Sequence, residues 1–315
     1  MIKAVAKSTF ILPKSCKDKL RDKTKQPCAD HFGALFFCSK LLLMRTVIYC
    51  LLQVKKTIII EVNLFGVHKM IYVTGDLHRE NDIDKLYKIA KLEKIPDIVL
   101  IAGDFGGIWA PVQNTENGVE PGELDKRFLK QLSEFPFKII TCLGNHENYD
   151  AISMLPRTET YGGKIIKLTD NVEILDRGYV FTIEGKKIFS LGGAMSPDKQ
   201  YRTEHKSWWS QETITEAEYQ RTLVELAKVN FTVDAVLTHT APSGILSSLM
   251  DFYIRAPVNC AYYMQAFSHD ESCKYLEKIR QELQFKHWYY GHFHEDIDFS
   301  CENKKFSCRY NSLQR

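Results

Sequence analysis

The sequence predicts an α/β protein in which helices flank two packed β-sheets. From Met70 to residue 144, short apolar strands alternate with amphipathic helices, which is typical of βαβ units and a mostly parallel sheet. After Asp150, short strands joined by tight turns follow, and the alternation then resumes toward the C-terminus. The 315 residues are 44% hydrophobic and 26% charged, an ordinary globular composition that is sufficient for a large core.

Apolar runs and helical spacing define the elements before Asp150. The run 97–103 is almost continuously apolar, which predicts a buried strand. In the segment 81–94, Ile83, Leu86 and Ile89 recur at helical spacing, which predicts an amphipathic helix. By the same criteria, the other elements of this half are a strand at 70–75, a helix at 122–135 and a strand at 137–144.

Short strands with turn residues between them dominate the next part of the chain. The stretch "IEGKKI" predicts a hairpin with Gly185 in its turn. From residue 215 onward, helices again alternate with buried strands. The predicted elements, in order, are strands at 164–168, 172–175, 178–185 and 186–193, a helix at 215–228, a strand at 233–239, a helix at 272–283, a strand at 286–294 and a terminal hairpin at 297–313.

The first 69 residues differ in composition from the rest. They carry 13 basic and 4 acidic side chains, which leaves 29 basic and 35 acidic side chains of the chain's 42 and 39 for residues 70–315. Lys40 and Arg45 interrupt their apolar segment, 34–56, so it lacks the roughly 18 uninterrupted apolar residues of a spanning helix. We predict that residues 1–69 are a basic extension outside the fold, that residues 70–315 form the domain, and that no membrane is bound.

Cysteine usage and charge exclude or disfavour several classes of protein. The nine cysteines are odd in number and form no CxxC pair, which argues against a disulfide framework and for a reducing, cytoplasmic compartment. No Cys-x5-Arg loop occurs, so a cysteine phosphatase is excluded. Residues 70–315 have an acidic balance and no basic stripe, which disfavours nucleic acid as a partner.

Five predicted core strands end in the same way. Each is followed by a small residue or a threonine, and then by a polar side chain of a metal-ligating type. Because ligands bind at the carboxyl ends of parallel strands, we expect these side chains to converge. Carboxylate, imidazole and amide oxygen suit divalent Mn, Fe or Zn, so the pattern predicts a metal cluster. The side chains are those of Asp76, His78, Asp104, Asn145, His146, His239, His292 and His294.

In chain order, the motifs D-x-H, GD, GNHE, an isolated H and GHxH resemble the calcineurin-like metallophosphoesterase superfamily. The resemblance extends from Met70 to the C-terminus. It implies a four-layer α-β-β-α sandwich of two mixed sheets, with a dinuclear metal centre at the strand ends. It also implies two divalent ions (Mn, Fe or Zn) and a small phosphorylated substrate. The implied reaction is hydrolysis of a phosphomonoester or phosphodiester by in-line attack of a metal-bridging hydroxide.

The resemblance also assigns roles to the strand-end residues. It implies that Asp104 bridges both metals, because a carboxylate has two oxygens for two ions. His146 holds no metal in this assignment and faces the substrate, where it donates a proton to the leaving alcohol or steadies the phosphate. The implied metal ligands are Asp76, His78 and His294 for the first ion and Asn145, His239 and His292 for the second.

The chain departs from the phosphoprotein phosphatase branch of this superfamily. It has "GDFGGIW" where that branch has GDxxDRG, so the partner of His146 and the arginine that binds phosphate are not assigned. Arg79 and Arg202 are the candidate substrate-binding residues. Two long segments, 107–123 and 192–212, are candidates to shape the pocket. The second resembles a stretch of an uncharacterised bacterial subgroup.

Within that second segment, two adjacent tryptophans have two interpretations. Trp208 and Trp209 either cover the site or anchor the segment to the core, and we favour the anchoring role. Three functions remain open for the whole domain: a phosphoesterase for small substrates, a nuclease or cyclic-nucleotide phosphodiesterase, and a non-catalytic metal-binding scaffold. The complete set of ligand types together with His146 favours an active enzyme, while the substrate is determined by loops that sequence motifs do not describe.

Overall fold

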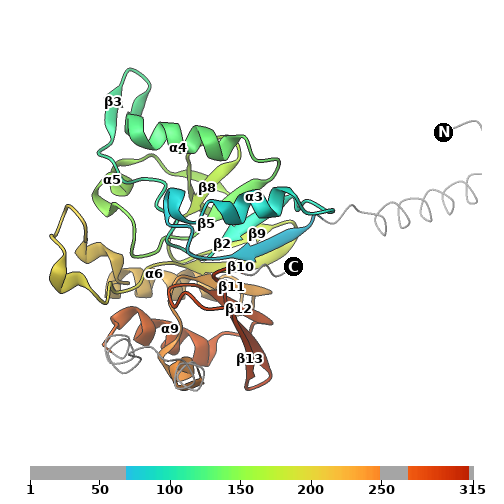
Figure 1. Cartoon of the computed structure of the whole chain (residues 1–315). Helices are drawn as coiled ribbons and strands as arrows, with labels where there is room; N and C mark the ends of the chain where they lie inside the picture. The colour runs from blue at the N-terminus through green and yellow to red at the C-terminus, as the bar shows by residue number, and fades with distance from the viewer. Residues whose placement is uncertain (1–68, 249–268, 312–315) are drawn as a thin grey trace, which may run out of the picture. The chain divides into compact units, whose positions relative to one another are not determined.

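The computed structural model describes residues 69–248 and 269–311, and the structural statements below concern these residues. They form an α/β fold with two six-stranded mixed sheets (Figure 1), which confirms the predicted fold class at this level. The predictions for residues 1–68, including the interrupted apolar segment 34–56, lie outside the described residues. In the described part, no helix has the length and apolarity needed to cross a bilayer.

The first sheet has the strand order β1-β2-β5-β8-β7-β6. Its first four strands run parallel, and β7 and β6 are antiparallel to their neighbours. The parallel strands therefore place their carboxyl ends along one edge. The strands are β1 (Ile71–Thr74), β2 (Ile98–Ile101), β5 (Lys138–Thr141), β6 (Thr158–Thr160), β7 (Gly163–Lys167) and β8 (Val172–Leu175).

The second sheet has the order β13-β14-β12-β11-β10-β9. Its four inner strands are parallel, and the outer strands β13 and β9 are antiparallel, each joined to its neighbour by a tight turn. Gly185 lies in the β9–β10 turn at positive φ, as predicted. The strands are β9 (Tyr179–Ile183), β10 (Lys186–Leu191), β11 (Ala235–Thr238), β12 (His287–Tyr290), β13 (Ile297–Cys301) and β14 (Lys304–Cys308).

Helices cover one face of each sheet, and local capping explains where several of them begin. The Thr215 and Glu218 side chains form a capping box at the start of α6, and the Asp270 side chain accepts from the backbone N–H of Ser272 at the start of α9. The helices are α3 (Asp84–Ala90), α4 (Glu123–Ser133), α5 (Tyr149–Met154), α6 (Glu216–Ala227) and α9 (Glu271–Glu282), with short 3-10 turns η1 (Arg79–Asn81), η2 (Lys199–Tyr201), η3 (Ser210–Glu212) and η4 (Ser243–Ile245).

The core divides into three apolar clusters, and strand β2 illustrates why. Its side chains alternate between the two faces of the sheet. Val99 and Ile101 pack in a cluster with residues of α3, α4 and α5. Ile98 and Leu100 pack in a second cluster that also contains residues of β9, β10 and β11 from the other sheet. A third cluster joins the second sheet to α6 and α9, which Figure 1 shows beside β11 and β12.

Every predicted strand and helix has a counterpart among the described residues, usually shorter at its ends. Sequence reasoning missed α5, β6 and a small hairpin, β3 (Gln113–Thr115) with β4 (Gly118–Glu120), inside the segment 107–123. Three of the six strand residues are exposed and three are partly buried, and Val119 is the one large apolar residue among them. The hairpin strands therefore lack the apolar alternation by which a strand is recognised.

Candidate metal centre

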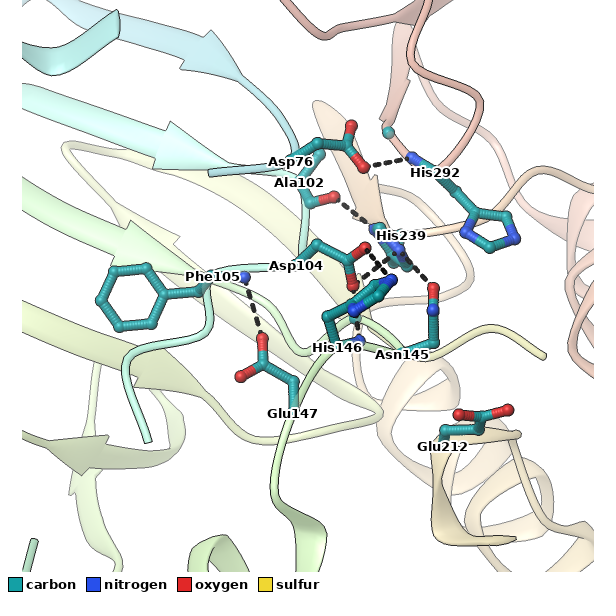
Figure 2. A network of polar contacts seen from close by, with 12 residues as sticks. Asp76, Ala102, Asp104, Phe105, Asn145, His146, Glu147, Glu212, His239 and His292 are labelled. Atoms are coloured by element: carbon teal, nitrogen blue, oxygen red, sulfur yellow. Dashed lines mark hydrogen bonds and ion pairs between the residues drawn. The ribbon is translucent and has the colours of Figure 1, made fainter. Parts of the chain in front are cut away.

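The strand-end side chains meet where the two sheets present their carboxyl edges. They follow β1, β2 and β5 of the first sheet and β11 and β12 of the second. The backbone N–H of His292 donates to Asp76 Oδ1 at 2.8 Å, which connects the loops of the two sheets (Figure 2). The structure thus brings together the eight residues that the sequence predicts for this site.

Three groups of side chains could each hold a cation. The ligand atoms within each group lie within 4.8 Å of one another. His78 and Asp104 each belong to two of the groups, so the three groups adjoin one another. The groups are Asp76 with His78 and His294, His78 with Asp104 and His146, and Asp104 with His239 and His292.

The contacts of His239 indicate that a positive charge belongs between its neighbours. Its Nδ1 donates to the backbone oxygen of Ala102 at 2.8 Å. Burial lowers the pKa of His239, but the charges of Asp104 and Asp76 outweigh this and raise it to about 9, so in the absence of a metal its Nε2 carries a second proton. That Nε2 lies 3.0 Å from Asn145 Oδ1 and 3.1 Å from Asp104 Oδ1 (Figure 2). When the ring is neutral, its Nε2 and these two oxygens are three acceptor atoms, so the position of the second proton suits a metal ion.

Burial and charge in the cluster also favour a cation. Burial raises the pKa of Asp76 to about 7, and its buried Oδ2 has no hydrogen-bond partner among the described residues. Burial lowers the pKa of His78, but its hydrogen bond to Asp104 and the charges of Asp104 and Asp76 outweigh this and raise it to about 9. The two carboxylates thus stabilise positive charge in a buried site, and the residues present fit divalent ions.

Several of these residues adopt a backbone conformation that is uncommon outside glycine. The φ angles are 50° at Asp76, 45° at His78, 47° at Asp104, 69° at His292 and 51° at His294. Residues in the left-handed region persist only where the surrounding structure holds them, and they cluster at functional sites. Packing of the strand-end loops, rather than local preference, therefore sets the direction of these side chains.

The glycines of the strand-end motifs make room for site residues. A Cβ at Gly144 would overlap both Oδ1 and the backbone nitrogen of Asp104. Without that Cβ, the backbone N–H of His146 donates to Asp104 Oδ1 at 2.8 Å. A Cβ at Gly291 would lie 2.5 Å from Asp76 Oδ2. Glycine is thus needed for the approach of neighbouring site residues.

His146 lies at the open side of the cluster, next to Arg202. Its side chain is 34% exposed. Its Nε2 lies 4.0 Å from Asp104 Oδ2 and 3.4 Å from Arg202 Nη2. Burial lowers the pKa of His146, and the charge of Arg202 acts in the same direction against that of Asp104. Asp198 holds the guanidinium of Arg202 with contacts of 2.8 and 2.9 Å. The structure therefore brings Arg202 to the site.

Arg79, the other candidate arginine, is engaged elsewhere. Its guanidinium contacts Asp125 Oδ1 at 2.6 Å and the backbone oxygen of Leu124 at 3.0 Å. It also lies 5.0 Å from the centre of the Phe128 ring. These partners belong to α4, so the contacts of Arg79 connect the loop after β1 to that helix.

Three further buried residues support the site, and sequence reasoning gave them no role in it. Glu147 Oε1 accepts from the backbone N–H of Phe105 at 2.9 Å, directly after Asp104. Burial raises the pKa of Glu147 to about 8. Ser196, which contacts Asn145, and Glu212, which contacts Ser196, both come from the segment 192–212. The only sequence signal for these two was the length of that segment.

The two tryptophans of this segment have structural contacts. Trp209 is 2% exposed, and its Nε1 donates to Asp150 Oδ2 at 2.8 Å. The Nε1 of Trp208 donates to Glu212 Oε1 at 2.7 Å. These contacts agree with the anchoring interpretation.

The match of the sequence to a known family identifies the class of this protein. Residues 69–296 match the calcineurin-like phosphoesterase family, and the chain belongs to that family. It is therefore a metallophosphoesterase, a hydrolase that binds divalent metals. No curated protein matches the sequence.

Solved structures with some likeness to this chain include three proteins. A putative 5'-nucleotidase from Staphylococcus aureus has 15% identity and a TM-score of 0.39, over 77% of this chain and 49% of its own. The protein TT1561 of Thermus thermophilus has 12% identity and a TM-score of 0.40, over 77% and 89%. The phosphopantetheinyl hydrolase of Mycobacterium tuberculosis has 14% identity and a TM-score of 0.36, over 78% and 91%.

Proposed function

We propose that this metallophosphoesterase hydrolyses a phosphomonoester or phosphodiester of a small substrate with the help of two divalent ions, Mn, Fe or Zn. The observation that carries the proposal is the position of Asp104, which lies in one group of candidate ligands with His78 and in another with His239 and His292. We assign Asp104 to both ions. The other ligands would be Asp76, His78 and His294 for one ion and Asn145, His239 and His292 for the other.

The three core clusters support a four-layer α-β-β-α arrangement, because one cluster lies between the sheets and two lie beneath helices. The family match starts at residue 69, which supports residues 70–315 as the enzymatic domain and residues 1–69 as an extension. The cytoplasmic location stays a prediction.

The chemistry that such ions supply when bound is Lewis-acid catalysis, which neutralises phosphate oxygens and makes water more acidic. In our proposal, Arg202 binds a phosphate oxygen beside His146, since a guanidinium donates several hydrogen bonds to an anion. His146 donates a proton to the leaving oxygen, supported by its position at the exposed side of the cluster. Asp198 keeps the guanidinium of Arg202 oriented.

The alternatives have less support. A non-catalytic scaffold would not need His146 and Arg202 placed side by side at the cluster. A nuclease or a cyclic-nucleotide phosphodiesterase has no specific feature in its favour among the described residues. The acidic balance of residues 70–315 disfavours a nucleic-acid substrate.

The test is an assay of the full chain with added Mn²⁺, comparing p-nitrophenyl phosphate with bis-p-nitrophenyl phosphate. Asp104→Asn is expected to abolish hydrolysis of both, because both metal groups lose a ligand. His146→Ala is expected to lower the rate by about 10²–10⁴-fold on an alkyl phosphate, whose leaving group needs a proton. Its effect is expected to be smaller on the p-nitrophenyl esters, whose leaving group is a stable anion.

His205→Ala is the matched control, because His205 belongs to the same segment as Arg202 but has a side chain that is 60% exposed and pairs with Asp150. This variant is expected to keep full activity. Metal binding without hydrolysis of any ester, by wild type under all these conditions, would instead support the scaffold.

A further inference from the structure

The side chain of Asn145 has two ends, and only one of them can ligate a metal. Its carbonyl oxygen carries lone pairs, whereas its NH2 group is a donor without a lone pair for a cation. The two ends have nearly the same shape, so the cavity alone does not select between them. A functional amide ligand therefore needs a neighbour that distinguishes oxygen from nitrogen.

Ser196 and Glu212 form such a neighbour. Asn145 Nδ2 donates to Ser196 Oγ at 3.1 Å. Ser196 Oγ donates to Glu212 Oε2 at 2.8 Å, and its backbone N–H donates to Glu212 Oε1 at 2.6 Å. The two residues are each 1% exposed. Water therefore does not compete for these contacts.

The number of available protons fixes the donor and the acceptor in each of these hydrogen bonds. A serine hydroxyl has a single proton, and a carboxylate only accepts. Because the proton of Ser196 goes to Glu212, Ser196 offers Asn145 only lone pairs. Asn145 must then turn its NH2 group toward Ser196, which leaves Oδ1 on the opposite end, 3.0 Å from His239 Nε2 (Figure 2).

Glu212 is itself held from several sides. Trp208 Nε1 donates to its Oε1 at 2.7 Å. Arg177 is buried, and its Nη2 donates to the backbone oxygen of Glu212 at 2.9 Å. The orientation of the carboxylate is thus determined by the packing of the segment 192–212, not by solvent.

We propose that Ser196 and Glu212 are positioning residues that turn the carbonyl oxygen of Asn145, and not its nitrogen, toward His239 and Asp104. The inference rests on the proposed function, in which Asn145 is a metal ligand. It gives the segment 192–212 a role in metal binding that is separate from the contact of Arg202 with His146.

The test measures binding of Mn²⁺ alone to the full chain by calorimetry. Burial raises the pKa of Glu212 to about 7, so we would work at about pH 8, where the carboxylate predominates. Ser196→Ala and the isosteric Glu212→Gln are each expected to weaken one of the two binding events by about 10–100-fold. Ser210→Ala is the matched control, since Ser210 has the same chemistry in the same segment but is exposed.

The same substitutions in an Asn145→Asp protein distinguish two roles of Ser196: orienting the Asn145 amide, or stabilising the loop in general. A carboxylate has two equivalent oxygens and needs no neighbour to choose between them. In this background, Ser196→Ala is expected to change Mn²⁺ affinity by less than about 3-fold, since the coupling between the two sites is removed. Equal losses in both backgrounds would overturn the inference and assign Ser196 to loop stability.

Thermal melting without metal reports whether each variant folds. If Ser196→Ala does not fold, Glu212→Gln carries the same comparison. Wild-type protein that binds no Mn²⁺ would overturn the proposed function and this inference with it. Wild-type binding with unchanged affinity in both variants would overturn the inference alone.

Discussion

Two long segments follow parallel strands of this fold, and they differ in what their polar side chains contact. The first, 107–123, follows the Asp104 turn, forms the exposed hairpin β3–β4 and is fixed to α4 through Asp125. The second, 192–212, buries Ser196 and Glu212 beside Asn145 and brings Arg202 to His146. Both have the length of a functional loop. The contacts of the polar side chains, and not the length of a loop, therefore indicate which loop serves the site.

The largest expected difference is between the two arginines. Arg202→Ala is expected to lower kcat/KM by about 10²–10³-fold, because it removes a donor from the phosphate site. Arg79→Ala is expected to lower it by less than about 3-fold, because its guanidinium contacts Asp125 and Leu124 of α4 and the backbone oxygen of Gly106, and none of the proposed site residues. The measurement is steady-state hydrolysis of the better p-nitrophenyl ester by the full chain with Mn²⁺. Equal effects of the two substitutions would mean that Arg79 serves the site as much as Arg202 of the second segment does.

A second prediction concerns the acids that hold these arginines. Asp125 is fully buried and also accepts from the backbone N–H groups of Trp109 and Ala110, at 3.0 and 2.8 Å. Asp125→Ala removes the carboxylate acceptor of both backbone donors and one acceptor of Arg79, so the free energy of unfolding is expected to fall by about 3 kcal/mol. Denaturant unfolding checks the value, and activity per folded molecule is expected to persist.

Asp198→Ala is the matched change in the second segment. The Asp198 side chain is 47% exposed, so the loss of stability is expected to stay below about 1 kcal/mol. Its expected effect is on kcat/KM, because Arg202 loses the partner that orients it. A large loss of stability without loss of activity would contradict the assigned role.

The sequence predicted the strands and the cluster because both follow from local patterns. A buried strand and a polar residue after it are neighbours in the chain, and the parallel arrangement of strands then brings the loops together. Local sequence patterns do not show which of the two arginines lies at the site. Arg79 directly follows His78, yet its guanidinium contacts Asp125, 46 positions later. Ser196 contacts Asn145 across 51 positions, and no periodicity in an irregular segment predicts such a pair.

The smallest expected effect comes from shortening the first segment. The strands β3 and β4 pair with each other as a two-stranded sheet, and none of residues 113–120 is buried. Replacing residues 113–120 by a short glycine linker removes the partly buried contact of Val119 with the core and the ion pair of Glu120 with Lys126 of α4, at 3.0 Å. The melting temperature is therefore expected to fall by no more than about 4 °C.

On the same reasoning, kcat/KM of the shortened protein is expected to stay within about 2-fold of wild type. The assay uses the same ester, and an alkyl phosphate in parallel tests a less activated substrate. A 10-fold loss on either would mean that the hairpin contacts the leaving group, since none of its described contacts reaches the metal cluster. In that outcome the first segment would also serve the site. The contacts of buried polar side chains would then identify only those pocket residues that are in place before the substrate binds.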